Sequence, residues 1–317
     1  MEKTKVIVIV GPTASGKTSL SIELAKQING EIISCDSMQI YKYMDIGTAK
    51  PTSEEQQGIQ HHLIDIISPE ERFSVSDYQA RAEKAIEEII SKGKVPIVVG
   101  GTGLYVNSLI YGIKFLDIEF NEEYRNELEQ RVEKEGLEVL YEEAKQIDPQ
   151  AMETISKNDK KRILRVLEIF HQTGITKTKQ DELSRSGELK YDYKVFGINI
   201  DREILYERIN ARVDEMLQKG LVNEVKEIYN KFDKFPTAMQ GIGYKEVVQY
   251  LQNDIPEQEM IEKIKMESRR YAKRQLTWFR KNKDIIWLNG LENKQNNMKI
   301  ILEEYSGKEK QEDKKEE

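Results

Sequence analysis

This sequence of 317 residues is poor in the side chains that build metal sites and covalent cross-links. It holds a single cysteine, Cys35, and three histidines, His61, His62 and His171. One cysteine excludes an intramolecular disulfide framework and a zinc site built on cysteines. The histidines are scattered along the chain, and we assign them no metal-binding or catalytic role.

Long apolar runs are also missing. No stretch approaches the ~20 residues that a membrane-spanning helix needs. The first residues, "MEKTK", lead directly into a strand-like run and leave no room for a signal peptide. Hydrophobic residues make up 38% of the chain and charged residues 33%, a balance typical of a soluble globular protein. We therefore expect a cytoplasmic enzyme without membrane contact.

An overall positive charge is lacking as well, because the formal net charge is −7. Taken alone, this value argues against a nucleic-acid partner. The basic residues are nevertheless bunched: residues 269–283 ("RRYAKRQLTWFRKNK") carry seven bases and no acid, and residues 157–165 ("KNDKKRILR") carry five bases against Asp159. Since the local field decides where a polyanion binds, these two clusters keep a nucleic-acid partner possible.

The first hundred residues predict repeated βαβ units. Strand-like runs at Val6–Val10, Glu31–Ser34 and Val95–Gly103 alternate with two segments of helical periodicity. The first carries Leu20, Leu24, Ala25 and Ile28 on one face, and the second lies at about 76–91. Gly30 is interpreted as the stop of the first helix. This alternation favours an α/β fold: a P-loop-type parallel sheet flanked by helices.

A helical insertion interrupts this pattern. Between about Lys114 and Lys194, Glu, Lys and Gln dominate and no β-branched run occurs, and strand character returns at Tyr193–Ile200. Asp201 then caps a predicted helix with a buried face. We predict a first part of the core at 1–113, an all-helical insertion domain at 114–193, a second part of the core at 194–305, and a disordered tail at 306–317.

The clearest motif is a phosphate-binding loop between the first strand and the first helix. Its glycines let backbone N–H groups converge on phosphate oxygens, its lysine supplies charge, and its threonine offers a hydroxyl to Mg²⁺. The pattern indicates a di- or triphosphate and does not reveal the chemistry. The residues predicted to bind a diphosphate or a nucleotide are Gly11, Pro12, Thr13, Ala14, Ser15, Gly16, Lys17 and Thr18.

The usual partner of such a loop in a nucleotide hydrolase is an aspartate at the end of a hydrophobic strand. The run "VPIVVGGTG" ends in glycines and threonine instead, and the acid, Asp36, follows the second strand. The carboxyl ends of parallel strands are where α/β sheets bind ligands. Asp36 could therefore bind Mg²⁺, position a small-molecule kinase substrate, or act as a general base beside the phosphates.

Five motifs in order, "GPTASGKT", "DSMQIYKYMDIGTAKP", "GGTGLY", "GIGYKE" and "RQLTWFR", resemble those of the tRNA dimethylallyltransferases in their bacterial form. The resemblance covers about residues 6–290. It implies transfer of a dimethylallyl group from dimethylallyl diphosphate to the exocyclic amine of the adenine on the 3′ side of the anticodon. The phosphate-binding loop would then hold the prenyl diphosphate, with Mg²⁺ on Thr18, and no phosphoryl group would be transferred.

Three further side chains are assigned roles in this reaction, Thr102 because it matches a position of the family near the target base. Asp36 would accept the proton of the amine as a general base. Thr102 would contact the target base, although a turn residue between glycines is the alternative. Arg208 and Arg212 stand one helical turn apart, and of the two Arg212 is predicted to bind the diphosphate; a surface pair with Glu215 is the alternative.

The tRNA anticodon stem-loop is the implied partner, and we expect the enzyme to act as a monomer. Basic side chains that share one face of the helical insertion are expected to bind it, while Ile163, Leu167 and Phe170 pack on another face. For the aromatic residues Trp278 and Phe279, anchoring of the C-terminal helix is an equal alternative to RNA contact. The predicted tRNA-binding residues are Asp36, Ser37, Met38, Gln39, Thr102, Arg125, Lys161, Arg162, Ile163, Leu164, Arg165 and Arg280.

Three other functions stay open at this stage. An isopentenyltransferase acting on free AMP or ATP would share the loop and the base but would not need the insertion or the basic clusters. A P-loop small-molecule kinase and a non-enzymatic RNA-binding module are more distant alternatives.

Overall fold

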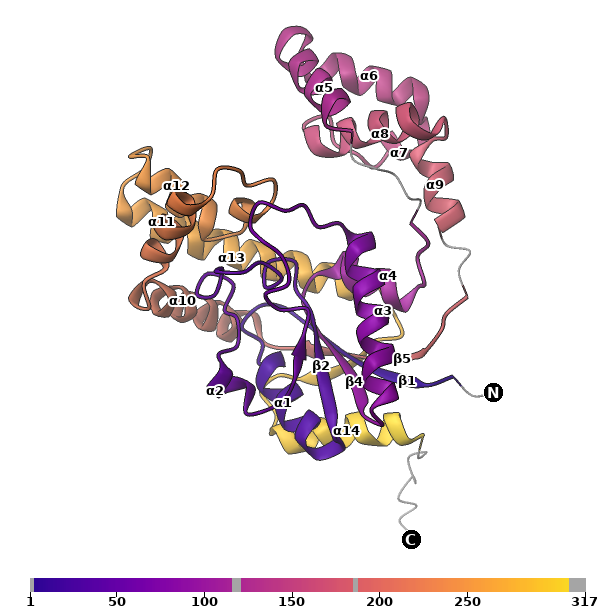
Figure 1. Cartoon of the computed structure of the whole chain (residues 1–317), viewed down its shortest axis with the longest axis vertical. Coiled ribbons are helices and arrows are strands. Elements are labelled where there is room, and N and C mark those ends of the chain that lie inside the picture. Colours follow the sequence, from indigo (N-terminus) through magenta and orange to yellow (C-terminus); the bar gives the residue numbers. More distant parts are fainter. Residues whose placement is uncertain (1–2, 116–120, 185–187, 308–317) are drawn as a thin grey trace. The chain divides into compact units, whose positions relative to one another are not determined.

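The computed structural model of this chain describes residues 3–115, 121–184 and 188–307. The chain folds into two compact units, one formed by residues 1–110 and 190–317 and the other by residues 111–189. Figure 1 shows the elements of each unit along the chain. The predicted disordered tail lies outside the described residues from 308 onward. The domain limits set at 113 and 193 remain predictions.

The first unit is built on one sheet of six parallel strands. The strand order is β3-β2-β4-β1-β5-β6, and every neighbouring pair is parallel. This arrangement, with helices on both faces, confirms the predicted α/β fold of P-loop type. The strands are β1 (Lys5–Val10), β2 (Gly30–Cys35), β3 (His61–His62), β4 (Val95–Gly100), β5 (Asp192–Asn199) and β6 (Ile286–Asn289).

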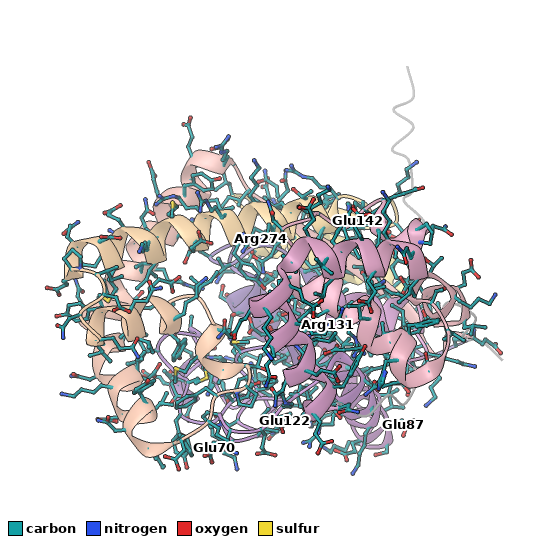
Figure 2. All side chains as sticks on the ribbon, turned by 90° about the horizontal axis from the view of Figure 1, so that it is seen from above. Glu70, Glu87, Glu122, Arg131, Glu142 and Arg274 are labelled. Atoms are coloured by element: carbon teal, nitrogen blue, oxygen red, sulfur yellow. The ribbon has the colours of Figure 1, made fainter. Side chains whose placement is uncertain are left out.

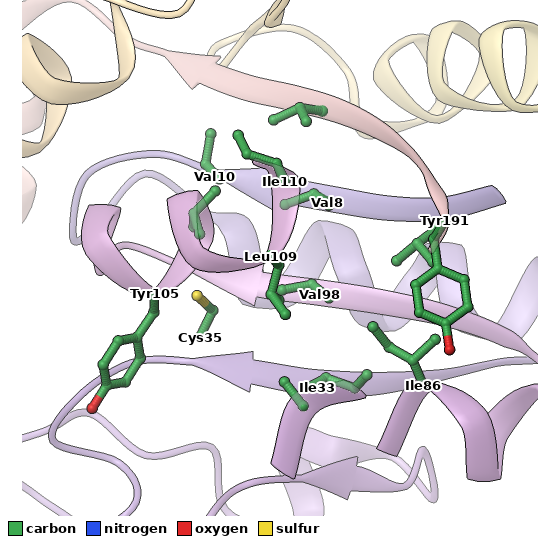
Figure 3. Packing of buried hydrophobic residues seen from close by; sticks show 14 of the residues in the cluster. Val8, Val10, Ile33, Cys35, Ile86, Val98, Tyr105, Leu109, Ile110 and Tyr191 are labelled. Atoms are coloured by element: carbon green, nitrogen blue, oxygen red, sulfur yellow. The ribbon is translucent and has the colours of Figure 1, made fainter. Parts of the chain in front are cut away.

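Helices cover the two faces of the sheet because its central strands are apolar on both sides. Ile7 and Ile9 of β1 pack against α1 (Lys17–Ile28) and α14 (Lys294–Ser306). Val6, Val8 and Val10 face the opposite way, against α3 (Val75–Ser91) and α4 (Gly103–Ile110). Figure 3 shows this second layer, with Leu109 of α4 beside Val98 and Ile110 beside Val8.

A third group of helices packs beside the carboxyl ends of the strands, where a shared core joins it to the loop after β2. Tyr41, Met44 and Ile40 of that loop are fully buried against Val213 and Val247. The elements of this group are α10 (Arg202–Gln218), α11 (Leu221–Lys231), η1 (Ala238–Gln240), α12 (Tyr244–Leu251) and α13 (Glu257–Phe279); a short helix α2 (Ser53–Gln56) follows the loop.

Helix boundaries follow local capping. Asp201 accepts hydrogen bonds from the backbone N–H groups of Glu203 and Ile204, which confirms the predicted cap of α10. The prediction that Gly30 stops α1 is wrong. The helix ends at Ile28 with Asn29 in the left-handed conformation (φ 52°), and Gly30 begins β2. Asparagine is the residue after glycine best suited to that conformation.

The second unit is all-helical in its described residues. Its core is formed by Leu128, Leu140 and Ala144 together with Leu164 and Leu167, all close to fully buried. The prediction that Phe170 packs with them is wrong, because this side chain is 39% exposed and lies beyond the part of its helix that the core covers. The helices are α5 (Glu122–Glu135), α6 (Leu137–Ile147), α7 (Pro149–Met152), α8 (Lys160–Thr173) and α9 (Lys177–Ser184).

Candidate functional site

The turn between β1 and α1 presents a row of backbone donors. In the described part of the chain, the N–H groups of residues 14–18 have no protein acceptor. Gly16, with φ 90°, sets the left-handed conformation in which the chain enters α1, and this geometry favours glycine. Successive N–H groups at a helix N-terminus form a binding site for an anion. The predicted loop thus has five consecutive donors available.

The first residues of the predicted loop have other partners. Thr13 donates its backbone N–H to Oε1 of Gln275 at 3.0 Å, and Pro12 has no N–H to offer. The carbonyl oxygen of Pro12 accepts from Nζ of Lys17 at 2.6 Å, which holds the ammonium beneath the loop. The uninterrupted row of free donors therefore starts at Ala14.

Two cations lie at this loop without a carboxylate partner. Nη1 of Arg212 donates to Oγ1 of Thr13 at 3.5 Å, and neither Arg212 nor Lys17 forms an ion pair within the described residues. The predicted alternative for Arg212, a pair with Glu215, does not form, because Glu215 pairs with Lys219 instead. Arg208 is exposed on α10, so of these two arginines it is Arg212 that lines the pocket beside the loop.

The absence of a carboxylate partner for Lys17 and Arg212 goes together with a lowered pKa of Lys17. Burial of its ammonium and repulsion by Arg212 lower the pKa to about 7, with Asp36 acting in the opposite direction. Burial likewise lowers the pKa of Arg212. Two desolvated cations that repel one another are stabilised when an anion enters between them. The site is therefore electrostatically prepared for a polyanion such as a diphosphate.

Asp36 follows β2 at the same edge of the sheet and lines the same pocket as Lys17 and Arg212. Its Oδ1 accepts from the backbone N–H of Met38 at 2.8 Å and of Gln39 at 3.3 Å. No described protein group donates to its Oδ2, which leaves that oxygen for a ligand. Cys35 beside it is buried, and burial raises the pKa of its thiol to about 12, so it is no nucleophile.

Thr102 lies opposite the start of the loop that follows β2. Its Oγ1 accepts from the backbone N–H of Ser37 at 3.1 Å, and its own N–H donates to the carbonyl of Cys35 at 3.2 Å. Such contacts exceed the role of a simple turn residue, because they fix the segment that carries Asp36. Asp36, Ser37 and Thr102 are thus brought together, as their predicted roles require.

Gln39 is predicted to pair with a base edge, but its amide is occupied within the protein. Its Nε2 donates to the carbonyls of Thr48 and Ala49, at 3.2 and 3.4 Å, and its Oε1 accepts from Oγ of Ser34 at 3.1 Å. In this conformation Gln39 closes the loop on itself. Met38 lines the pocket with its side chain.

Sequence reasoning missed the side chains that anchor this loop from outside. The carboxylate of Glu224 on α11 accepts the backbone N–H groups of Asp45, Ile46 and Gly47, at 3.0, 2.7 and 3.1 Å, and the hydroxyl of Tyr244 at 2.6 Å. A Cβ on Gly47 would lie 2.5 Å from the Tyr244 ring, which explains the glycine. No pattern in the sequence signals Glu224, because it occupies an ordinary amphipathic helix.

The pocket enclosed by these elements has a volume of about 390 Å³. Lys17, Arg212 and Asp36 supply its charge, and Arg274 of α13 also lines it and is labelled in Figure 2. Its apolar side is formed by Ile209, Val213, Met216 and Ile264. Residues 14–18 and Arg212 line a second pocket of about 320 Å³, which shares Lys17, Thr18 and Arg212 with the first. The site can hold an anion beside an apolar group.

The described residues contain no cluster of three or more His, Cys, Asp or Glu side chains that could hold a metal ion by themselves. Thr18, the predicted Mg²⁺ ligand, is exposed and lines both pockets. A single hydroxyl fits Mg²⁺ when phosphate oxygens and water supply the remaining ligands. The residues present are therefore compatible with a metal that arrives with a diphosphate.

In the helical unit the predicted RNA-binding residues divide into two groups. Lys161, Arg162 and Arg165 are exposed or half-exposed on α8; Arg162 pairs with Asp159 at 3.0 Å and Arg165 with Glu168 at 3.4 Å. Ile163 and Leu164 are fully buried, so their side chains pack inside the unit and do not face solvent. Arg125 is held by Glu129 and Glu168, at 3.1 and 2.9 Å.

At the end of α13, Phe279 is buried and anchors the helix, which is one of its two predicted roles. Trp278 is 39% exposed and lies against Gly103, where an added Cβ would come within 2.3 Å of its ring. Arg280 donates to Oδ1 of Asn199 at 3.1 Å. Trp278 and Arg280 thus remain at the surface of the first unit.

No described helix is long and apolar enough to cross a membrane.

Comparison with known proteins relates this chain to enzymes that modify tRNA. The protein-family model for IPP transferase matches residues 39–282. The chain is 53% identical over 285 residues to the tRNA dimethylallyltransferase of Acetivibrio thermocellus, covering 90% of this chain and 91% of the relative. It is 48% identical over 289 residues to that of Bacillus anthracis, covering 91% and 92%.

Solved structures give the same result. The tRNA isopentenylpyrophosphate transferase of Bacillus halodurans aligns with a TM-score of 0.72 and 43% identity, and 96% of each chain is covered. A eukaryotic dimethylallyltransferase acting on tRNA aligns with a TM-score of 0.79 and 32% identity, covering 98% of this chain and 81% of the other.

Proposed function

This chain belongs to the IPP transferase family, and we propose that it transfers a dimethylallyl group from dimethylallyl diphosphate to tRNA. The acceptor is the exocyclic amine of the adenine on the 3′ side of the anticodon, and diphosphate is released. One observation carries the proposal: two cations without a carboxylate partner, Lys17 and Arg212, line the same pocket as Asp36, whose carboxylate has an unused oxygen. The same two cations also line a pocket at the loop whose five backbone N–H groups have no protein acceptor.

The bond changes match this arrangement. The amine nitrogen attacks the first carbon of the prenyl chain, the bond from that carbon to the diphosphate oxygen breaks, and the proton of the amine passes to Asp36. The lone pair of the amine is delocalised into the adenine ring, so loss of the proton must accompany attack. Asp36 accepts through Oδ2 while Oδ1 stays bonded to the loop.

Departure of the diphosphate places negative charge on its oxygens. The N–H groups of residues 14–18 stabilise that charge together with Lys17 and Arg212, because all these residues line one pocket at the loop. Mg²⁺ held by Thr18 together with the diphosphate would neutralise part of the same charge. The apolar side formed by Ile209, Val213 and Met216 receives the prenyl chain.

The target base must leave the anticodon stack, which costs a few kcal/mol. Thr102 and Ser37 contact the adenine beside Asp36. Exposed basic side chains on α8 and at the end of α13 hold the surrounding RNA. We propose that the enzyme acts as a monomer. A tRNA substrate also favours a cytoplasmic location.

The direct test supplies the protein with dimethylallyl diphosphate, Mg²⁺ and either unmodified tRNA or AMP. We expect the mass increment of one dimethylallyl group on the tRNA and none on AMP. Modified AMP with untouched tRNA would indicate an enzyme of free nucleotides, and ATP turnover that depends on a small acceptor would indicate a kinase. RNA binding without any transfer would indicate a binding module.

The RNA contact has its own test. Replacing Lys161, Arg162 and Arg165 together with glutamine should weaken tRNA binding and flatten its dependence on salt, because each lost phosphate contact removes about one unit from the logarithmic slope. Lys145 or Lys179, on other helices of the same unit, provides a single-charge control. An unchanged slope would show that these side chains are only a solvated helix face.

A further inference from the structure

Gln275 is a buried amide to which the proposed mechanism assigns no role. It lies on α13 and is 6% exposed. Both ends of its side chain are bonded: Oε1 accepts from the backbone N–H of Thr13 at 3.0 Å, and Nε2 donates to the carbonyl of Gly101 at 3.0 Å. A buried amide with both ends satisfied is a fixed connector between the two segments that it joins.

The two segments belong to opposite halves of the reaction. Thr13 begins the diphosphate loop, and its hydroxyl accepts from Arg212. Gly101 precedes Thr102, whose hydroxyl holds the backbone of Ser37 next to Asp36. The side chain of Gln275 therefore connects two parts of the site. One is the loop that receives the diphosphate, and the other is the turn that positions Asp36 and the target adenine.

The fit around this amide is close. A Cβ on Gly101 would lie 2.0 Å from Nε2 of Gln275, so only glycine permits the contact. Tyr271 stands one turn earlier on α13 and also interacts with Thr102. The same helix thus reaches the acceptor side twice, and of these two side chains only Gln275 extends to the diphosphate loop.

We propose that Gln275 is a positioning residue that sets the distance between the diphosphate loop and the Thr102–Asp36 side of the pocket. This inference rests on the proposed function. Because transfer needs the amine, the reacting carbon and the leaving oxygen in line, a small displacement between the two halves lowers the rate of transfer more than it weakens binding of either substrate. The Thr13 N–H is also kept away from the diphosphate, so the amide defines where the row of free donors begins.

The test compares three variants. Gln275→Leu removes both hydrogen bonds, whereas Gln275→Glu keeps an acceptor for the N–H of Thr13 and loses the donor to Gly101. Gln258→Leu, at an exposed position near the start of α13, is the matched control for the substitution itself. We expect kcat to fall by roughly 10²-fold in Gln275→Leu, and less in Gln275→Glu, with KM for both substrates little changed.

A double-mutant cycle separates positioning from a general loss of structure. In a Thr102→Ala background, Gln275→Glu should cost much less than in the wild type, because the group that Gln275 positions is already gone. Multiplicative losses in this cycle, an unchanged kcat in either Gln275 variant, or a raised KM with unchanged kcat would overturn the proposal. Should Gln275→Leu fail to fold, the cycle with Gln275→Glu decides. A wild-type protein that transfers nothing to tRNA refutes the proposed function instead, and this outcome is distinguishable before any variant is made.

Discussion

The two edges of the sheet treat buried charge in opposite ways. At the amino edge, Glu31 of β2 is 3% exposed and is surrounded by His62, Lys94 and Lys92, at 2.7, 2.8 and 3.1 Å. Burial by itself would raise the pKa of Glu31, but hydrogen bonds from these partners lower it to about 2. At the carboxyl edge, burial and repulsion by Arg212 bring the pKa of Lys17 down to about 7.

The difference distinguishes charge that serves the fold from charge that serves a ligand. A buried ion that is fully paired holds the segments around it together, whereas a desolvated cation without a carboxylate partner costs stability until an anion binds. Substitutions at the two edges should therefore act on different measured quantities. Those at the carboxyl edge should change the reaction, and those at the amino edge should change unfolding.

The largest effect is expected at Asp36. Asp36→Ala should lower kcat by about 10²–10⁴-fold while tRNA affinity is kept, since only the proton acceptor is lost. Asp36→Asn retains an Oδ1 for the N–H groups of Met38 and Gln39, and it should be equally slow. A fast Asp36→Asn would mean that the residue holds the loop and takes no proton; steady-state kinetics with unmodified tRNA decides.

Removal of an unpaired cation should harm the reaction and help the fold. Lys17→Met is expected to lower kcat/KM for dimethylallyl diphosphate by about 10²–10³-fold, as loss of one transition-state donor does. The same substitution should raise the free energy of unfolding in the absence of ligand, because a desolvated charge disappears. Denaturant titration and initial rates measure both. A variant that loses stability together with activity would contradict the assignment of unbalanced charge.

The matched substitution at the amino edge is Glu31→Gln. It should lower the free energy of unfolding by roughly 2 kcal/mol, because several charge-assisted hydrogen bonds are lost. Transfer by the protein that remains folded should proceed at the wild-type rate. A lower kcat in fully folded Glu31→Gln would show that the two edges are coupled. It would contradict the separation between charge that serves the fold and charge that serves the ligand.

The smallest effect is the pH dependence of stability, and its sign differs between the edges. The lowered pKa of Glu31 gives stability that is complete above its ordinary value of 4.5 and is lost as pH falls toward 2. For Lys17 the unfolded chain binds a proton that the folded protein releases, so stability rises with pH from about 7 toward 10.5.

As the pH rises from 7 to 9, the Tm of the wild type should therefore increase by a few degrees relative to the Tm of Lys17→Met. Thermal unfolding at each pH measures this difference. Between pH 5 and 3 the wild type should lose stability relative to Glu31→Gln. Parallel curves in either pair would indicate that the group in question titrates normally.

Much of the carboxyl edge could be predicted because it is written in local patterns. Alternating strand and helix periodicity indicates the sheet, Asp201 marks the start of α10, and the loop from Gly11 to Thr18 stands between a strand and a helix, as its motif requires. In each case the decisive contacts lie within one segment, and a pattern of residue types is enough to reveal them.

The remaining contacts join segments far apart in the sequence, and no local pattern encodes them. Glu224 binds a loop about 180 residues away, and Gln275 lies 262 residues from Thr13. Gln275 belongs to a motif that the sequence displays, but its partners become visible only when α13 is placed against the sheet. For the same reason the burial of Ile163 and Leu164 and the exposure of Phe170 depend on which helices cover α8. The RNA-binding roles of the exposed basic side chains remain predictions.

The most direct test is a crystal structure of the protein with an unreactive analogue of dimethylallyl diphosphate. The account predicts diphosphate oxygens within hydrogen-bonding distance of the N–H groups of residues 14–18, with Lys17 and Arg212 beside them. The Asp36 carboxylate should face the first carbon of the prenyl chain. A diphosphate bound away from Lys17, or a carboxylate at Asp36 turned from the donor, would contradict it.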